Sequence, residues 1–267
     1  PSSQKVVGLV DLSQQKRRLL GRLRNGKSRK REGLVLVEGL RAVKEAIDAK
    51  AEVRFVVASE RIESTTAGLA LAEHIRKENL DITTVSEKEL AALADTKHPQ
   101  GILMVCKEQQ MELPDILRVG GCYLVLDGVQ DPGNVGTLIR AAAAFAVDAV
   151  ITLDGTADTW SPKTVRASAG VVFRLSVAHA AAEEAIREIT KAGVPIWVAD
   201  PGAPSLKAKP DDRGFALVLA NEGAGPRQAV LDAAEHMVRV PISGQVDSLN
   251  VAVAGAILLY ELTKTEE

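Results

Sequence analysis

Aromatic residues and cysteines are scarce in this sequence, and each scarcity excludes a class of site. Phe, Trp and Tyr make up 3% of the 267 residues, too few for a platform on which several nucleic-acid bases could stack. The two cysteines, Cys106 and Cys122, lie far apart, with no CxxC motif and no histidine cluster nearby. We therefore expect core cysteines in a reducing compartment rather than a metal or redox site.

Long apolar runs and metal-binding patterns are also missing. No apolar run reaches the roughly 18 residues that a membrane span requires, and residues 1–18 lack the basic-then-apolar order of a secretory signal. None of His74, His98, His179 and His236 has a neighbour typical of a metal ligand set. With 46% hydrophobic and 25% charged residues, the sequence predicts a cytoplasmic globular protein with no membrane attachment and no metal.

Acidic residues are absent from residues 16–31, where nine basic residues occur. The formal net charge of the chain is −2, so the other residues carry 24 basic and 35 acidic side chains, a net charge of −11. A block this basic in an acidic protein predicts a polyanionic partner, because each neutralised phosphate releases counterions. The alternative is a solvated helix face or the remnant of a targeting segment. We expect phosphate and shape contacts rather than base stacking.

Hydrophobic periodicity predicts a small α/β domain after this basic segment. Ser86, followed three residues later by Glu89, is a capping-box signature for one of its helices. The other expected elements are strands at 34–37, 53–58, 82–85 and 102–105 and helices at 38–49 and 66–77.

A second α/β domain is predicted after a linker marked by Pro114 and the Gly120-Gly121 pair. Its strands are continuously apolar, which indicates burial on both faces and a mostly parallel sheet. The expected strands are 123–126, 149–153, 195–199, 215–220 and 237–240, and the expected helices include 135–145, 181–192 and 228–234. The predicted boundaries are a basic arm at 1–32, the small domain at 33–112, the linker at 113–122 and the second domain at 123–267.

Ligands of such sheets bind beyond the carboxyl ends of the strands, here in the loops after Leu126, Ala220 and Val240. In the first loop, Asn134 is expected to cap the next helix, and Arg140 falls within two helical turns of it. The loop is neither a GxGxxG fingerprint nor a phosphate loop. A capped helix with a solvated arginine is the alternative interpretation.

The second and third loops are also rich in polar groups. Glu222 is the single charge in residues 219–226, where it could alternatively cap a helix. In the third loop, Gly244, Asp247, Ser248 and Asn250 precede an apolar helix that has no charge before Glu261. Hydrogen-bonding groups set directly on a buried helix are suited to holding a polar ligand against a rigid scaffold.

Together the three loops resemble the three motifs of the SpoU (TrmH-like) branch of the SPOUT RNA methyltransferases. Residues 36–47 resemble the substrate-binding domain of the same family, a ribosomal-protein-like α/β fold, and residues 161–170 lie where these enzymes carry a similar segment. The resemblance extends across essentially the whole chain. The matching residues are Asn134, Gly136 and Arg140 in the first motif, Asn221, Glu222 and Gly223 in the second, and Ser248, Leu249 and Asn250 in the third.

The resemblance implies an α/β fold with a C-terminal trefoil-knotted, mostly parallel sheet (the SPOUT fold), although general rules of chain connection disfavour knots. It further implies S-adenosylmethionine bound in a bent form within the knot, and an obligate homodimer. The apolar helix at 249–259 would then be buried in the knot and in the dimer interface. That burial would explain why the helix is apolar on all sides rather than along one stripe.

The implied activity is methyl transfer from S-adenosylmethionine to a ribose 2′-hydroxyl of structured RNA, with ribosomal RNA the expected substrate. Alternatives are a tRNA methyltransferase, an antibiotic-resistance rRNA methyltransferase, and a non-catalytic RNA-binding or ribosome-assembly protein that retains the fold. By similarity, Arg140 would contact the hydroxyl or a neighbouring phosphate. Because an arginine normally stays protonated, we expect a phosphate clamp that stabilises the alkoxide. The alternative role for Arg140 is that of general base.

The resemblance also assigns the remaining site residues. Asn134 and Glu222 would orient Arg140 and the ribose, and Ser248 and Asn250 would complete the catalytic site through hydrogen bonds. Many relatives carry glycine where Ala220 stands, which should not exclude the cofactor if only backbone is used. The expected cofactor-binding residues are Ala220, Gly223, Val240, Ile242, Gly244 and Leu249, and the expected RNA-binding residues are Arg17, Arg18, Arg22, Arg24, Lys27, Arg29, Lys30, Arg31, Lys163 and Arg166.

Overall fold

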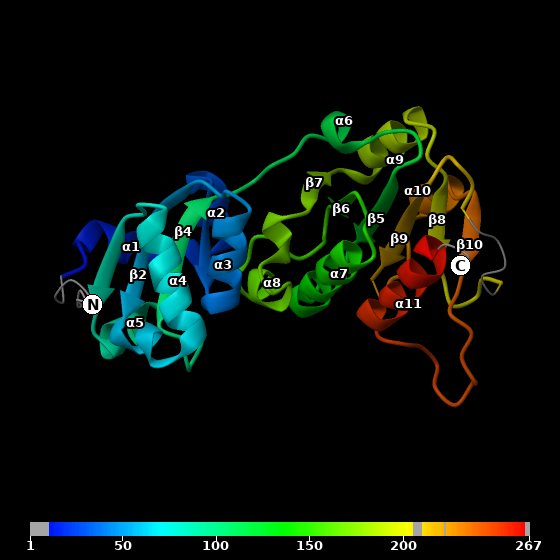
Figure 1. The fold of residues 1–267 in the computed structure, drawn as a ribbon. Coiled ribbons are helices and arrows are strands. Elements are labelled where there is room, and N and C mark those ends of the chain that lie inside the picture. The colour runs from blue at the N-terminus through cyan, green and yellow to red at the C-terminus, as the bar shows by residue number, and fades with distance from the viewer. Residues whose placement is uncertain (1–10, 205–209, 222, 265–267) are drawn as a thin grey trace. The chain divides into compact units, whose positions relative to one another are not determined.

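The computed structural model describes residues 11–204, 210–221 and 223–264. The chain divides into two compact units (Figure 1). The first unit comprises the described residues up to Gln109 together with Trp160–Phe173, and the second comprises Gln110–Thr159 and the described residues from Arg174 onward. No helix among the described residues is both long enough and apolar enough to cross a membrane.

The first unit is built on a four-stranded sheet with the order β1-β4-β2-β3. Strand β4 runs antiparallel to both β1 and β2, whereas β2 and β3 are parallel. The predicted cap is confirmed, because the Ser86 side chain accepts a hydrogen bond from the Glu89 backbone N–H. The elements are β1 (Leu34–Glu38), α3 (Leu40–Asp48), β2 (Val53–Ser59), a 3₁₀ turn (Glu60–Ser64), α4 (Thr66–Lys77), β3 (Ile82–Val85), α5 (Glu87–Leu93) and β4 (Ile102–Lys107).

The basic N-terminal segment is not a separate arm, in contrast to the predicted boundary at residue 32. It forms helices α1 (Gln14–Leu23) and α2 (Gly26–Glu32), and Gly33 ends α2 in the left-handed conformation. Leu20 and Leu23 of α1 are fully buried in the same hydrophobic cluster as strand residues of the small sheet. The many charges of this segment predict an exposed arm, but these two leucines pack it against the domain core.

A segment between β6 and β7 also belongs to the first unit. It contains α8 (Pro162–Ala167) and a 3₁₀ turn (Val171–Phe173). The Arg166 guanidinium lies 2.8 Å from an Asp95 carboxylate oxygen and 3.6 Å from one of Glu38, a carboxylate that is itself buried. These ion pairs attach α8 to the end of β1, since an unpaired charge at Glu38 would be costly to bury.

The second unit contains a six-stranded sheet with the order β10-β8-β9-β5-β6-β7, and every pair in it is parallel. The sequence predicts the parallel sheet but not its edge strand β7. The segment predicted as a linker contains α6, whose Leu113 and Ile116 join the core. The elements are α6 (Leu113–Ile116), β5 (Cys122–Asp127), α7 (Pro132–Ala144), β6 (Ala149–Leu153), β7 (Ser176–Ala180), α9 (Ala182–Lys191), β8 (Ile196–Ala199), β9 (Phe215–Ala220), α10 (Gln228–Asp232), β10 (His236–Val238) and α11 (Val251–Thr263).

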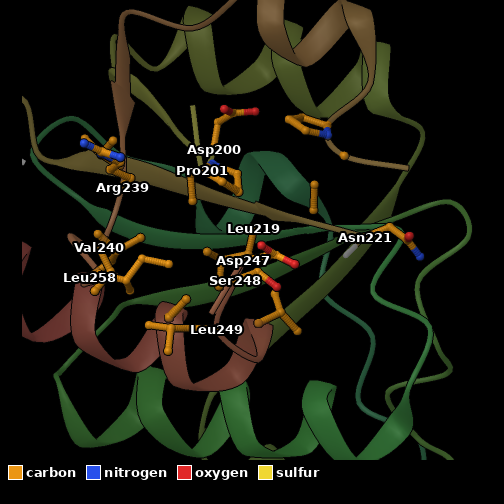
Figure 2. Close-up of a pocket in the computed structure, with 18 of the residues that line it drawn as sticks. Asp200, Pro201, Leu219, Asn221, Arg239, Val240, Asp247, Ser248, Leu249 and Leu258 are labelled. Carbon is orange, nitrogen blue, oxygen red and sulfur yellow. The ribbon is translucent and has the colours of Figure 1, made fainter. Parts of the chain in front are cut away.

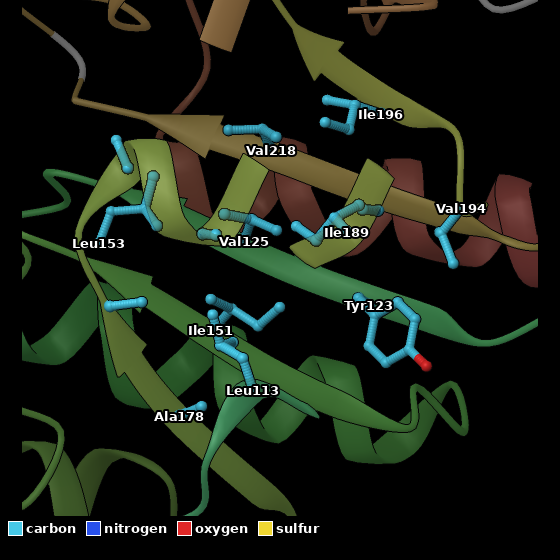
Figure 3. Packing of buried hydrophobic residues seen from close by; sticks show 14 of the residues in the cluster. Leu113, Tyr123, Val125, Ile151, Leu153, Ala178, Ile189, Val194, Ile196 and Val218 are labelled. Carbon is cyan, nitrogen blue, oxygen red and sulfur yellow. The ribbon is translucent and has the colours of Figure 1, made fainter. Parts of the chain in front are cut away.

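Alternate residues of the strands face two different layers of helices. On one face, Val125, Ile151 and Val218 pack with Ile189 of α9 (Figure 3). On the opposite face, Leu219 of β9 lies against Gly255 of α11, and α11 also packs along α7. The sheet is therefore covered on both faces, and its carboxyl edge remains as the place for a ligand.

Candidate functional site

A cavity of about 460 Å³ lies at the carboxyl ends of β8, β9 and β10 (Figure 2). The loop before α11 and the first turns of α11 close it. The strand ends and the third loop therefore form one site, as the sequence predicted for the loops after Ala220 and Val240. The lining residues include Ala199, Asp200, Pro201, Leu219, Ala220, Asn221, Gly225, Pro226, Val238, Arg239, Val240, Ile242, Gly244, Val246, Asp247, Ser248, Leu249, Val251, Ala254 and Leu258.

Most of the residues expected to hold the cofactor lie in this cavity wall. Ala220, Val240, Ile242, Gly244 and Leu249 all line it. Gly223, the sixth expected residue, is not among the lining residues; its backbone N–H donates to the Asn221 side chain at 2.8 Å. The structure thus gathers residues from two separate loops around one space.

Sequence reasoning missed the contribution of the loop after β8. Asp200 and Pro201 line the cavity, and the Asp200 carboxylate accepts a hydrogen bond from the Gly202 backbone N–H at 2.7 Å. Asp-Pro-Gly directly after an apolar strand is a turn signal. Because this strand ends at the same sheet edge as the others, that signal could have identified the loop. Arg239, at the end of β10, was also missed.

Asn221 organises the second loop through its side chain. Its Nδ2 donates to the Gly128 carbonyl at 3.1 Å, and its Oδ1 accepts from the backbone N–H groups of Gly223 and Ala224. One amide therefore joins the loop after β9 to the loop after β5. Glu222, the charged residue of this motif, lies outside the described residues.

The first loop differs from its prediction in the identity of the helix cap. Helix α7 begins at Pro132, and its cap is Asp131, whose carboxylate accepts from the backbone N–H groups of Gly133 and Asn134. Asn134 therefore lies inside the first turn, and its side chain is not used as a cap. Asn134 Oδ1 instead accepts a hydrogen bond from Asn250 Nδ2 at 3.1 Å.

Asn250 also caps α11, because its Oδ1 accepts from the backbone N–H groups of Ala252 and Val253. The predicted catalytic residues Asn134 and Asn250 are thus in direct contact. A third, Ser248, lines the cavity. Arg140 is exposed on α7, and no partner of its guanidinium is found among the described residues. That side chain remains available for an anionic ligand.

The predicted RNA-binding residues fall into two groups. Arg29 is buried, and its guanidinium donates to the Leu23 and Arg24 carbonyls at 2.8 and 2.9 Å, which closes the end of α1. Arg17 is also held within the domain, by Glu89 at 2.8 Å. Arg166 of α8 pairs with Asp95 and Glu38, as described above. Lys163 is exposed on the same helix. Arg24, which follows α1, is exposed, but its guanidinium donates to the Ala92 and Ala94 carbonyls at 3.1 and 2.6 Å. The other predicted residues of α1 and α2 are exposed, namely Arg18, Arg22, Lys27, Lys30 and Arg31.

The two cysteine thiols do not form a metal or redox site. Burial raises the pKa of the Cys106 thiol to about 12, and burial also raises the pKa of Cys122. Both thiols are therefore held in the neutral form, which is neither nucleophilic nor metal-binding. No group of three or more possible metal ligands occurs in the described part of the chain.

Two known families match the chain, one in its N-terminal part and the other in its C-terminal part. Residues 14–104 match the MRM3-like substrate binding domain, and residues 121–260 match the SpoU rRNA Methylase family. The first match begins in α1, which agrees with the packing of that helix into the small domain.

Similar proteins share this layout over nearly their whole length. The chain is 35% identical over 245 residues to the 23S rRNA (guanosine(2553)-2'-O)-methyltransferase RlmP of Bacillus subtilis, which covers 90% of this chain and 93% of the relative. It is 30% identical over 237 residues to the 23S rRNA (guanosine-2'-O-)-methyltransferase RlmB of Xylella fastidiosa, and the match covers 85% of this chain and 95% of the relative. A solved AdoMet-bound rRNA methyltransferase from Sinorhizobium meliloti has a TM-score of 0.80 at 29% identity, covering 95% of this chain and 96% of that one. The chain belongs to the SpoU rRNA methylase family.

Proposed function

We propose that this protein is an S-adenosylmethionine-dependent methyltransferase that methylates a ribose 2′-hydroxyl of ribosomal RNA. The observation that carries the proposal is the convergence of all three loops at one edge of the parallel sheet, where Asn134 and Asn250 meet beside the cavity lined by Ser248. The names of the relatives RlmP and RlmB support the same reaction and the same class of RNA.

The cavity suits S-adenosylmethionine in size and in chemistry. Its volume of about 460 Å³ is within the usual range for small-molecule sites, about 300–1,000 Å³. Leu219, Val240 and Leu258 provide apolar walls for an adenine ring, and the carboxylates of Asp200 and Asp247 complement the cationic sulfonium and ammonium groups. The solved relative from Sinorhizobium meliloti is an AdoMet-bound protein. The cofactor, when bound, supplies an already activated methyl group.

The chain's own residues would align the ribose and stabilise charge on its oxygen. We assign Arg140 to a phosphate of the substrate or to the developing alkoxide, because its guanidinium is exposed and cationic. Asn134, Asn250 and Ser248 would orient the ribose by hydrogen bonds. Glu222 keeps its proposed orienting role from the family resemblance.

The exposed basic residues of α1 and α2 form the proposed RNA-binding surface. Lys27, Lys30 and Arg31 follow helical spacing on α2, as do Arg18 and Arg22 on α1. Arg22 and Arg31 share the carboxylate of Glu32, at 3.5 and 3.1 Å, and all five side chains are exposed enough to neutralise one phosphate each. Such contacts hold RNA in register without reading its sequence.

A homodimer and a trefoil knot belong to the same proposal. Helix α11 exposes Val253, Ile257 and Tyr260, which are 48%, 39% and 52% exposed and recur at helical spacing. An apolar stripe of this kind supports burial against a second copy of the chain. The knot and a cytoplasmic location, where ribosomal RNA would be met, follow from the family resemblance.

The decisive experiment compares 2′-O-methylated positions in total RNA from cells with and without the protein. Purified protein, S-adenosylmethionine and the RNA containing the lost position should restore the methylation. Arg140→Ala should slow transfer by about 100-fold, the usual loss for one electrostatic stabiliser, while cofactor affinity stays unchanged. Arg187→Ala, at an exposed arginine of α9, is the matched control. Near-normal transfer by Arg140→Ala would refute the assigned catalytic centre. A wild-type protein that binds RNA without S-adenosylmethionine but does not methylate it would favour the non-catalytic alternative.

A further inference from the structure

An ion pair between a buried carboxylate and a half-buried arginine lies beside the cavity and outside every predicted set of site residues. Asp127 ends β5, and its side chain is only 1% exposed. Arg227, which follows the second loop, places Nε 2.8 Å from Asp127 Oδ1. The Arg227 backbone N–H also donates to Asp127 Oδ2 at 2.9 Å. Both carboxylate oxygens of Asp127 are therefore held by one residue.

The same arginine reaches a third strand end. Its Nη2 donates to the Asp154 carbonyl, in the loop after β6. Gly155 follows with φ of +87°, and a Cβ at this position would lie in van der Waals contact with that guanidinium group, 3.6 Å from Nη2. Arg227 therefore connects the end of β5 with the loops after β6 and β9. All three strands end at the carboxyl edge of the sheet.

Both ends of the second loop are anchored on the end of β5. At the start of the loop, the Asn221 backbone N–H donates to the Asp127 carbonyl at 3.0 Å, and the Asn221 side chain donates to the Gly128 carbonyl. At its end, Arg227 binds the Asp127 carboxylate. Between these anchors the loop contributes Asn221, Gly225 and Pro226 to the cavity wall.

We infer that Arg227, through its ion pair with Asp127, is a positioning residue that sets the shape of the methyl-donor side of the cavity; this rests on the proposed function. Neither residue lines the cavity, and the two side chains bind each other, so we assign them no contact with the donor or with the reacting atoms. Removing the guanidinium would leave the buried Asp127 carboxylate with the Arg227 backbone N–H but without a positive charge beside it, and the loop would have to move so that water could reach Asp127. The cavity wall would move with it.

The effect should therefore fall on the donor rather than on the transfer step. Arg227→Gln should raise both the Kd and the KM for S-adenosylmethionine by at least tenfold. At saturating donor, kcat should fall by less than the donor affinity does, because Arg140, Asn134 and Asn250 lie on other elements and, of the proposed catalytic residues, Glu222 alone belongs to the second loop. RNA affinity should also stay unchanged.

The test is a double-mutant cycle of Asp127→Asn, Arg227→Gln and the double variant, each measured by calorimetric titration with S-adenosylmethionine and by steady-state kinetics. The donor affinity of the double variant should be no lower than that of the single variant with the lower affinity, because the two side chains act as one unit. Arg227→Lys keeps the charge without the planar fork and should recover part of the affinity. Arg187→Gln on α9 is the matched control.

Hydrogen exchange separates positioning from general loss of structure. In Arg227→Gln, exchange should accelerate at the Gly223 and Ala224 amides, which donate to Asn221, and stay slow in β5 and β9. Donor affinity within twofold of the wild type in both single variants would overturn the inference, and so would faster exchange throughout the second unit. Wild-type protein that binds no S-adenosylmethionine would instead refute the proposed function, and the inference with it.

Discussion

Asn250 Nδ2 donates a hydrogen bond to Asn134 Oδ1 at 3.1 Å, although the two residues are 116 positions apart in the chain. Each lies at the beginning of a helix, Asn134 in the first turn of α7 and Asn250 at the cap of α11. One side chain thus performs two tasks, since Asn250 Oδ1 caps α11 while its Nδ2 reaches the first loop. The two tasks can be separated by substitution.

Asn250→Ser should keep the cap and lose the hydrogen bond to Asn134. The hydroxyl oxygen can still accept from the Ala252 and Val253 amides, but the shorter side chain does not reach Asn134 Oδ1. We expect methyl transfer to fall about tenfold, which corresponds to one hydrogen bond of about 1.4 kcal/mol, with the free energy of unfolding unchanged. Asn250→Ala should lose the same activity and also about 1 kcal/mol of stability. Transfer assays and urea unfolding measure both, and equal stability of the two variants would contradict the capping role.

Much of the second unit could be predicted from its sequence because buried parallel strands are continuously apolar. Strands β6 and β9 have the predicted ends, and their carboxyl termini locate the cavity. Edge strand β7 escaped prediction because Ser176 and His179 interrupt its apolar run. Such polar residues are tolerated where one side of a strand has no neighbour.

The errors at the site arose where a side chain had two possible partners. Asn134 was a reasonable cap by residue type, but Asp131 stands three residues earlier, next to a proline suited to the first helical position, and takes the role. The buried role of Arg29 was likewise invisible in a run of charges, because only tertiary packing shows which arginine turns inward. Composition predicts a polyanionic partner for the segment but does not predict its internal hydrogen bonds.

The exposed basic face of α1 and α2 should control the salt dependence of RNA binding. Replacing Arg18, Arg22, Lys27, Lys30 and Arg31 by glutamine should weaken RNA binding and reduce the slope of log K against log salt by about 0.9 for each phosphate that is no longer neutralised. Cofactor affinity should not change. Deleting the segment is unsuitable as a test, because it removes the buried Leu20 and Leu23.

The matched control for this face is Arg187→Gln with Lys191→Gln, two exposed basic residues of α9. Filter binding at several salt concentrations supplies the slopes. An unchanged slope in the variant with five substitutions would assign RNA binding to another surface.

Cys106 should make the protein less stable at alkaline pH. Its folded-state pKa is raised to about 12 by burial, whereas an unfolded cysteine ionises near pH 8.5. Below about pH 8.5 the thiol is neutral in both states and does not affect the pH dependence. Above it, only the unfolded chain ionises, so stability falls by about 1.4 kcal/mol per pH unit until about pH 12.

Comparison with Cys106→Ala isolates this contribution from those of other titrating groups. Between pH 8 and pH 10, the wild type should lose about 2 kcal/mol more than the variant in chemical unfolding. Parallel pH profiles of the two proteins would show that the thiol is accessible to water in the folded state.

Gly255 sets the distance between α11 and the sheet. A Cβ at this position would overlap the side-chain methyl groups of Leu219 and Leu138, both of which are buried. Gly255→Ala should therefore cost about 1–3 kcal/mol through overpacking, more than the roughly 0.5–1 kcal/mol that alanine contributes in a helix. Because Leu219 also lines the cavity, S-adenosylmethionine should bind more weakly.

Gly21→Ala in α1 is the matched control, since no atom lies within 4 Å of the added Cβ, and it should slightly stabilise the first unit. Denaturant unfolding and donor titration check both variants; if Gly255→Ala is as stable as Gly21→Ala, α11 does not depend on this close approach to β9 and α7.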